Sequence, residues 1–168
     1  MTNLIEISKK VRVGKNGRMR ISAKADYAVQ AAVGLASVGE ITRAEQIAER
    51  YAIPLKFLER ILHELRHAGV VGSRRGPDGG YFLARDADAI TVADVIRAVD
   101  GPLADVHGLA PEAVEYDGSL AVLQEIWIAV RANLRAVLEA VTIADLVAGR
   151  LPEGVERLTR EPGSWSRR

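Results

Sequence analysis

The order of elements in residues 42–83 constrains the fold of this chain more than any other feature of the sequence. Two short segments with helical apolar spacing are separated by the tight turn Ala52-Ile53. The second segment begins at Pro54, which suits the start of a helix, and ends at Gly69, which suits its stop. Two β-prone runs then flank the glycine-rich stretch 74–80. Helix, turn, helix and hairpin in this order predict a winged helix-turn-helix.

Capping signals predict where the other helices begin. Ser22 is a good N-cap for a helix that precedes the helix-turn-helix, and Thr42 with Glu45 has the spacing of a capping box. Thr91 and Asp94 open a fourth helix in the same way. A hydrophobic content of 48% with 5% aromatic residues favours helices over a β-sandwich. The predicted fold class is mainly α, with a small β-hairpin wing and a long C-terminal dimerisation helix.

Glycine, proline and charge divide the sequence into segments. The expected segments are a flexible basic arm (1–18), a winged helix-turn-helix (19–101), a loop (102–118), the dimerisation helix with a short terminal helix (119–150) and a loose tail (151–168).

Charge is distributed unevenly, although the net charge is only +1. Residues 41–85 carry eight Lys or Arg and five acids, whereas residues 86–156 carry four Arg and thirteen acids. This polarity suggests that the first half faces a polyanion. The absence of cysteine excludes disulfides and thiolate metal sites from this chain. With no bilayer-length apolar run and no secretion signal, we expect a cytoplasmic, nucleoid-associated protein without membrane contact.

The helix of residues 54–68 has two different faces. One is apolar and is expected to pack on the preceding helices: Leu58, Ile61, Leu62, Leu65 and Ala68. The other is polar: Lys56, Glu59, Arg60, His63 and His67. In a major groove, this polar face offers donors to guanine or phosphate and a carboxylate to cytosine. A merely solvated face is the alternative interpretation.

The predicted hairpin strengthens the DNA-binding interpretation. Arg74 and Arg75 lie beside glycines that let the backbone approach a phosphate or enter a narrow groove. An exposed hairpin whose glycines only make turns is the alternative. Solvation alone does not require a basic hairpin directly after such a helix, so the two elements together predict a DNA-binding surface.

Several motifs, in this order and spacing, resemble the Rrf-type transcriptional regulators. The motifs are Met19-Arg20-Ile21-Ser22, Asp26-Tyr27-Ala28, Ile47-Ala48-Glu49, Ile53-Pro54-x-x-Phe57-Leu58-Glu59-x-Ile61-Leu62, Leu65-x-x-Ala68-Gly69-Val70-Val71, Arg75-Gly76-x-x-Gly79-Gly80-Tyr81 and Ile90-x-x-x-Asp94-Val95-Ile96-x-Ala98-Val99-x-Gly101. The resemblance covers about residues 19–150 and leaves out the basic arm and the tail.

This resemblance implies a winged-helix homodimer that binds a palindromic operator, with Glu59 and Arg75 reading bases. Lys56 stands where the cluster-regulating branch of the family has a serine, so a different operator sequence is expected. We predict a sequence-specific transcription regulator, a repressor, whose partners are double-stranded DNA and a second copy of the chain. The residues expected to contact DNA are Ser22, Lys24, Tyr27, Thr42, Lys56, Glu59, Arg60, His63, Arg74, Arg75, Gly76 and Gly79.

The C-terminal half contains an apolar seam with alternating spacings of three and four, which is the pattern of paired helices. A helix from about Ser119 to Ala140 would be about 33 Å long, longer than a small domain needs for its own core. We therefore expect it to pair with a second copy, although a long intramolecular core helix is the alternative. The seam residues are Leu120, Leu123, Trp127, Val130, Leu134, Val137 and Val141.

Many members of the family hold an iron–sulfur cluster through cysteines in the loop after the fourth helix. Here residues 102–118 contain none, and His107 with scattered carboxylates cannot replace thiolates. His63 and His67 have the spacing of a metal-binding pair, but their face is better explained by phosphate contact or solvation. We expect no cofactor, and place an unknown small-molecule or protein effector near residues 102–118.

Two other classes of function are alternatives to DNA binding. An enzyme would use Asp94, Asp100, His107 or Glu115, but these fall in no recognisable catalytic arrangement, so no enzymatic activity is expected. A winged-helix protein-interaction module that responds to an effector without specific DNA binding is the main alternative. Salt-dependent binding to random duplex DNA separates it from a DNA-binding protein.

Overall fold

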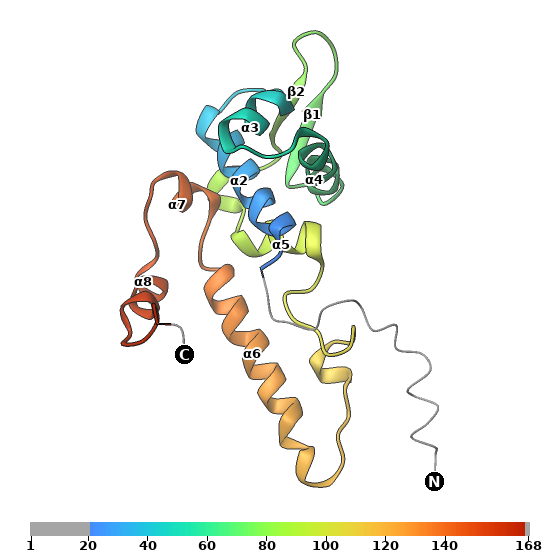
Figure 1. Cartoon of the computed structure of the whole chain (residues 1–168), viewed down its shortest axis with the longest axis vertical. Helices are drawn as coiled ribbons and strands as arrows, with labels where there is room; N and C mark the ends of the chain where they lie inside the picture. Colours follow the sequence, from blue (N-terminus) through green and yellow to red (C-terminus); the bar gives the residue numbers. More distant parts are fainter. Residues whose placement is uncertain (1–20, 167–168) are drawn as a thin grey trace. The chain divides into compact units, whose positions relative to one another are not determined.

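The computed structural model describes residues 21–166, which form two compact units. The larger comprises residues 21–103 with 135–166, and the smaller comprises residues 104–134. The fold is mainly helical with one hairpin, as predicted (Figure 1). The helices are α2 (Ala23–Val38), α3 (Ala44–Tyr51), α4 (Leu55–His67), α5 (Val92–Asp100), α6 (Val122–Leu138), α7 (Ile143–Val147) and α8 (Glu153–Arg160), with strands β1 (Val71–Arg74) and β2 (Gly80–Leu83). Short 3-10 turns lie at Ala87–Ala89, Pro111–Ala113 and Gly118–Leu120.

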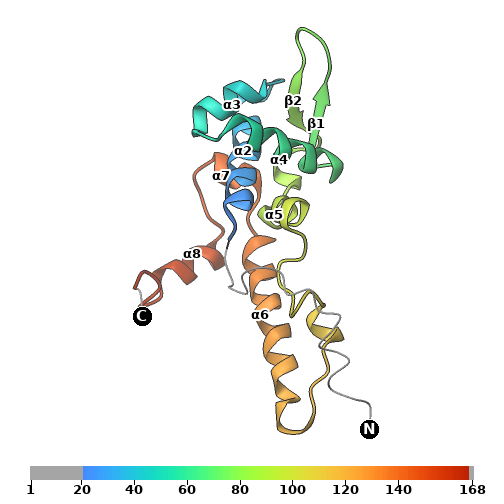
Figure 2. The ribbon, with the colours of Figure 1, turned by 45° about the vertical axis from the view of Figure 1, so that its right-hand side comes forward.

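Helix α2 is the central helix of the larger unit and packs against α3, α4, α5 and α7 (Figures 1 and 2). Ser22 is its N-cap, as predicted, and its hydroxyl accepts a hydrogen bond from the Ala25 N–H at 2.9 Å. The buried face of α2 consists largely of alanines, whose small side chains let the neighbouring helices approach closely. These alanines are Ala25, Ala28, Ala31 and Ala32.

Helix α4 is divided into two faces as its sequence predicts. Leu58, Ile61, Leu62 and Leu65 are fully buried in the core. Ala68, which was expected on the same face, is instead the exposed C-cap of the helix. The apolar spacing therefore fixes the side of α4 that packs, and leaves its polar side on the surface.

The predicted hairpin is present as an antiparallel pair, in register from Val71 opposite Leu83 to Arg74 opposite Gly80. Its base is also joined to the segment before α3. The Thr42 N–H donates to the Tyr81 carbonyl at 2.9 Å, and the Tyr81 N–H donates to the Thr42 carbonyl at 2.8 Å. These two bonds fix the base of the wing to the helix-turn-helix.

The predicted capping box of Thr42 and Glu45 is wrong by one residue. Arg43 is the N-cap of α3, and its backbone N–H donates to Oε1 of Gln46 at 3.0 Å. Thr42 cannot serve as the cap because its backbone pairs with Tyr81, and its hydroxyl donates to the Glu40 carbonyl at 3.0 Å. Tertiary pairing of the chain has overridden the local capping signal.

Helices α5 and α7 begin side by side in space, although their first residues are far apart in the sequence. Thr91 and Thr142 form an isolated β-bridge, and each opens its helix with a capping box completed by Asp94 or Asp145. Hydrogen bonds from Thr142, and then from Arg150, hold the pKa of Asp145 below its ordinary value. The fourth helix predicted to begin at Thr91 is thereby confirmed.

The C-terminal elements differ from their predicted bounds. Helix α6 has 17 residues and ends at Leu138, so it is about 26 Å long rather than 33 Å. Val141 lies beyond it and is only 6% exposed, so it belongs to the core rather than to a dimer seam. The tail expected to be loose contains α8, which carries acids in its first turn and arginines in its last, as the helix dipole favours.

The predicted basic arm of residues 1–18 lies outside the described residues. Within residues 21–166, every helix is too short or too polar to cross a bilayer.

Candidate nucleic-acid interface

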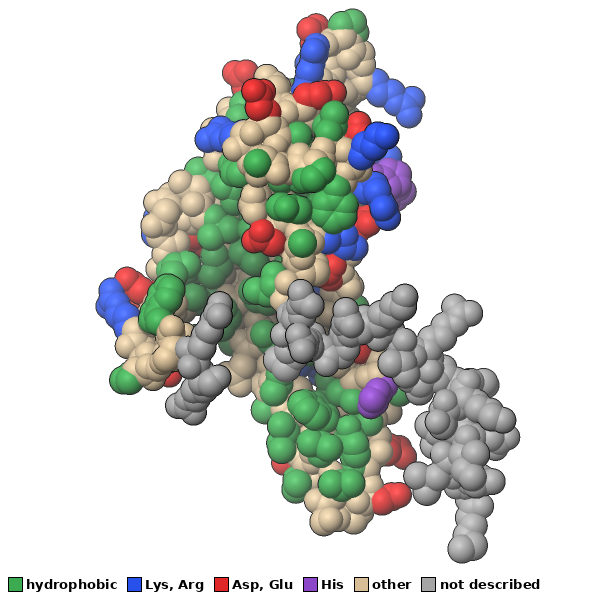
Figure 3. Space-filling view, in the orientation of Figure 1, with side chains coloured by type: hydrophobic (Ala, Val, Ile, Leu, Met, Phe, Trp, Pro, Cys, Tyr) green, Lys and Arg blue, Asp and Glu red, His purple; other side chains and the backbone are tan. Residues whose placement is uncertain are grey.

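The polar face of α4 is exposed along its whole length. All its predicted members lie on the surface, while the opposite face fills the core. Lys, Arg and His side chains gather along the side of the molecule formed by α4 and the hairpin (Figure 3). The exposed residues are Lys56, Glu59, Arg60, His63 and His67.

Arg66 connects this face to the wing, although its sequence position gave no separate signal. One Nη of Arg66 donates to the Ser73 hydroxyl on β1 at 3.4 Å. The other lies 3.5 Å from Nδ1 of His63, whose ring packs edge-on against His67 at a centroid distance of 4.4 Å. A guanidinium and two imidazoles thus form one polar cluster between α4 and the hairpin.

The two arginines at the wing tip, Arg74 and Arg75, differ in their hydrogen bonding. The Arg74 guanidinium donates to the Asp78 carbonyl at 3.3 Å and so stays with the hairpin. Arg75 is exposed and forms no hydrogen bond or ion pair with residues 21–166. Its side chain is therefore available to a ligand without breaking an internal contact.

The two tip glycines have conformational roles. Gly76 has φ of 111°, which L side chains rarely adopt. A Cβ on Gly79 would lie 2.4 Å from the Arg74 carbonyl oxygen, so any side chain there would displace the turn. Both glycines shape the tip that presents Arg75, whether or not their own backbone meets a ligand.

The remaining predicted contact residues are engaged within the fold. Ser22, besides capping α2, donates its hydroxyl to Asp100. The Lys24 ammonium lies 3.1 Å from Glu64 and 3.7 Å from Asp100, so two carboxylates share its charge. Tyr27 stacks edge-on against Phe57 at 5.8 Å. These side chains hold α2 against α4 and α5.

Thr42 is the clearest correction among the predicted contacts. It is only 5% exposed, and its hydroxyl donates a hydrogen bond to the Glu40 carbonyl. Because it has almost no free surface, it is part of the fold rather than of an interface.

The smaller unit shows what occupies the region of the predicted effector loop. The side-chain amide of Gln124 on α6 donates to three carbonyls of the loop, at 3.4 Å to Pro111, 3.2 Å to Glu112 and 2.7 Å to Val114. The Trp127 indole N–H donates to the Tyr116 hydroxyl at 3.1 Å. These hydrogen bonds hold the loop against α6 of the same chain.

An ion pair adds to this fastening. Arg131 on α6 lies 2.6 Å from Glu112. A backbone N–H hydrogen bond and then the Arg131 guanidinium hold the pKa of the Glu112 carboxyl below its ordinary value. His107 sits in a turn with φ of 54° and is exposed.

Together, the packed helices α3 and α4, the exposed polar face of α4 and the adjoining wing define this chain as a winged helix-turn-helix protein. Comparison with known proteins gives its family. Residues 21–149 match the Rrf2 family, described as "Iron-dependent Transcriptional regulator". The chain belongs to the Rrf2 family and is a DNA-binding transcriptional regulator. The expected resemblance and the expected absence of enzymatic function are confirmed.

Relatives and solved structures agree with this assignment. The chain is 45% identical over 142 residues to the HTH-type transcriptional regulator Rv1287 of Mycobacterium tuberculosis, covering 83% of this chain and 88% of the relative. The crystallised CymR, titled the global cysteine regulator of B. subtilis, shares 34% identity at a TM-score of 0.66, covering 77% and 97% of the two chains. The IscR of T. potens shares 33% identity at 0.63, covering 81% and 90%.

The family description implies iron, but the donor set of this chain does not fit it. The chain has no cysteine to hold a cluster. Within residues 21–166, no three His, Asp or Glu side chains come together as a metal site would require. Glu112, Val114 and Tyr116 of the predicted effector loop instead form hydrogen bonds or an ion pair with α6.

Proposed function

We propose that this regulator binds a palindromic operator as a homodimer, reading it with the exposed face of α4 and with Arg75 of the wing. The observation that carries the proposal is that key side chains of this surface have no partner within the described fold. The side chains of Lys56, Glu59, Arg60 and Arg75 form no hydrogen bond or ion pair within residues 21–166, while the opposite face of α4 fills the core. A cationic surface kept beside an exposed hairpin is suited to a duplex.

Roles within this surface follow from charge and reach. We assign base reading to Glu59 and Arg75, because a carboxylate accepts from cytosine and a guanidinium donates twice to guanine. Lys56, Arg60 and His63 lie on the same exposed face and are assigned to phosphates or neighbouring bases. Ser22, Lys24 and Tyr27 are assigned only supporting contacts, since their polar groups already have partners in the fold.

The proposed dimer uses α6, with a change in the residues that face the partner. The indole N–H of Trp127, a residue of the predicted seam, donates a hydrogen bond to Tyr116 of its own chain. In contrast, Val122 and Ile126, one helical turn apart, are 60% and 50% exposed. Apolar side chains gather over α6 and the loop before it (Figure 3). Such an exposed apolar stripe favours a covering partner, and a second copy is the simplest one.

We further propose that DNA binding does not depend on iron. Gln124, Trp127 and Arg131 hold the loop to α6 without a metal. An unknown effector near residues 102–118 remains compatible with this, because Leu109 is 50% exposed in the same unit. The protein would act on chromosomal DNA in the cytoplasm, and a dimer bound across a promoter would repress transcription by excluding the polymerase.

The test is selection of bound sites from random duplex DNA by the purified chain, with and without an iron chelator. The expected result is an inverted repeat with half-sites about 10–10.5 bp apart or a multiple of that spacing, equally enriched in both conditions. The affinity should fall steeply with salt. An absence of binding at low ionic strength would overturn the proposal and favour the protein-interaction module.

Two further measurements test the finer parts of the proposal. Sedimentation at micromolar concentration should give a dimer, and a monomer would refute the role of α6. Transcription in vitro from a promoter that carries the selected site should decrease when the protein is added. An increase would show activation instead of repression.

A further inference from the structure

The tip of the wing is held from outside the hairpin by a residue that the sequence did not single out. An Nη of Arg43, the N-cap residue of α3, donates to the Pro77 carbonyl at 2.5 Å. Among the hydrogen bonds of residues 21–166, this is the one that reaches the tip from another element. The two residues are 34 positions apart, so the bond ties the helix-turn-helix directly to the wing.

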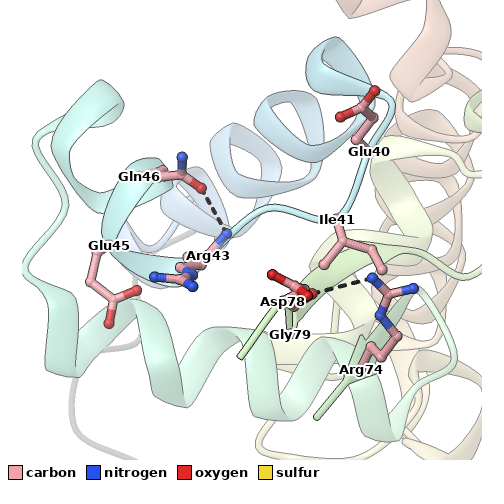
Figure 4. A pocket seen from close by; sticks show the side chains of 8 residues that line it. All are labelled: Glu40, Ile41, Arg43, Glu45, Gln46, Arg74, Asp78 and Gly79. Atoms are coloured by element: carbon pink, nitrogen blue, oxygen red, sulfur yellow. Dashed lines mark hydrogen bonds between the residues drawn. The ribbon is translucent and has the colours of Figure 1, made fainter. Parts of the chain in front are cut away.

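The tip needs such a tie because the hairpin itself is small. Each strand has four residues, and an isolated two-stranded hairpin of this kind is marginally stable in water. Within the tip, the Gly79 N–H donates to the Gly76 carbonyl at 2.9 Å. Arg74 and Arg43 then approach the turn from two sides (Figure 4). The tip is therefore set by two guanidiniums, one on each side.

The base of the wing is fixed separately, close to the same residue. Tyr81 pairs with Thr42, and a Cβ on Gly80 would lie 2.6 Å from the Thr42 carbonyl oxygen. The wing base thus approaches the residue before Arg43 as closely as the backbone allows. Consecutive residues of one segment hold the base and the tip of the hairpin.

Direct contact of Arg43 with DNA is disfavoured by its surroundings. Arg43 lines an open hollow between the start of α3 and the wing (Figure 4). The charged side chains of this hollow are two arginines and three carboxylates: Arg43, Arg74, Glu40, Glu45 and Asp78. A site with more negative than positive groups does not attract a phosphate.

We infer that Arg43 is a positioning residue, which sets the wing tip so that Arg75 reaches the operator. Arg75 lies two residues before Pro77, the acceptor of the Arg43 bond. A base contact must be held within about 0.5 Å of its productive geometry, and the tie at Pro77 supplies this restraint. The inference rests on the proposed DNA-reading role of Arg75.

The first test needs no DNA. Hydrogen exchange at the Gly79 amide should become about threefold to tenfold faster in Arg43→Ala, as for loss of one supporting hydrogen bond. Arg50→Ala removes the same charge from an exposed position on the same helix and should leave this exchange unchanged. Arg43→Lys keeps a donor and should restore most of the protection. Equal exchange in Arg43→Ala and the parent would overturn the inference.

The second test is a double-mutant cycle on the selected operator. Arg43→Ala should weaken binding about threefold to tenfold, whereas Arg43→Ala with Arg75→Ala should bind no worse than Arg75→Ala alone. Additive losses would refute the positioning role and indicate a direct contact of Arg43. If the parent protein binds no DNA, the proposed function fails, while the exchange experiment still decides whether Arg43 holds the tip.

Discussion

Replacing Arg75 by alanine tests the proposed reading of DNA by the wing. The guanidinium of Arg75 forms no hydrogen bond or ion pair within residues 21–166, so its removal should leave the stability of the fold unchanged. Arg74 is different, because its guanidinium supports the Asp78 carbonyl. Any loss of binding in Arg75→Ala therefore reports a contact with DNA rather than damage to the hairpin.

The size of the loss follows from the number of copies. One good base contact by arginine contributes about 1–3 kcal/mol. A dimer presents two copies of Arg75, so Arg75→Ala should cost about 2–6 kcal/mol on a full operator. This corresponds to a loss of at least about thirtyfold in affinity. On a single half-site, the cost should be about half as large in free energy.

The assay is a fluorescence-anisotropy titration of the operator and of a scrambled duplex over a range of salt concentrations. A base contact should lower the operator affinity and leave the salt slope unchanged. A phosphate contact should instead reduce the slope by about 0.9 per protomer and weaken both duplexes alike. Arg157→Ala, an exposed arginine on α8, is the charge-matched control. Equal operator affinity of Arg75→Ala and the parent would refute the assignment.

Other predictions follow from the remaining elements. Ile126→Glu places a charge on the exposed stripe of α6 and should shift the protein to a monomer with weaker operator binding. The control Asn133→Glu adds the same charge on the same exposed side without removing an apolar group, and should have a smaller effect. An unchanged sedimentation coefficient for Ile126→Glu would contradict this prediction. Gly79→Ala should weaken operator binding as much as Arg75→Ala while the melting temperature changes little, because its Cβ displaces the wing turn; full affinity would show that the turn tolerates the shift. Iron chelation should leave operator affinity unchanged in a matched titration, and a loss reversed by added iron would refute metal independence. The folded-state pKa of Asp145 is depressed, so its stabilisation is present above the unfolded-state value of about 4 and is lost as the pH falls through the folded value. Asp145→Asn should therefore melt at a lower temperature than the parent at pH 7, with a difference that shrinks as the pH falls below about 4, and a constant difference would contradict this origin.

Local patterns in the sequence predicted the parts of the fold that local physics decides. The helical spacing of Leu58, Ile61 and Leu65 identified the buried side of α4, since apolar burial follows this period. The glycines that follow Arg75 identified the hairpin, because a tight turn needs them. The exposed surface of α4 could therefore be predicted from the same pattern that fixes the core.

Contacts between distant residues were missed because they leave no periodic signal. Lys24 was expected on the DNA surface, yet Asp100 and Glu64 share its charge from two other helices. The bond from Arg43 to Pro77 spans 34 positions and was likewise invisible. Long polar side chains reach several partners, and only the fold decides which of them they meet.

Two errors in the predicted helix boundaries arise at residues whose type is compatible with more than one structure. Residues 151–168 were expected to be a loose tail, although Pro152 is the N-cap residue of α8 and proline is well tolerated where a helix starts. Thr42 has the composition of a cap, but β-pairing with Tyr81 took its backbone. In both cases the residue type was compatible with two structures, and for Thr42 its partner in space selected one.

The division of α4 into a buried and an exposed face also bears on how such regulators diverge. Leu58, Ile61, Leu62 and Leu65 keep the helix in place, whereas Lys56, Glu59 and Arg60 contribute little to holding it there. Surface substitutions of this kind usually change stability by less than about 0.5 kcal/mol. A lineage can therefore change the target sequence one amino acid at a time without passing through unfolded intermediates, and related regulators in one genome can acquire separate targets while sharing one scaffold.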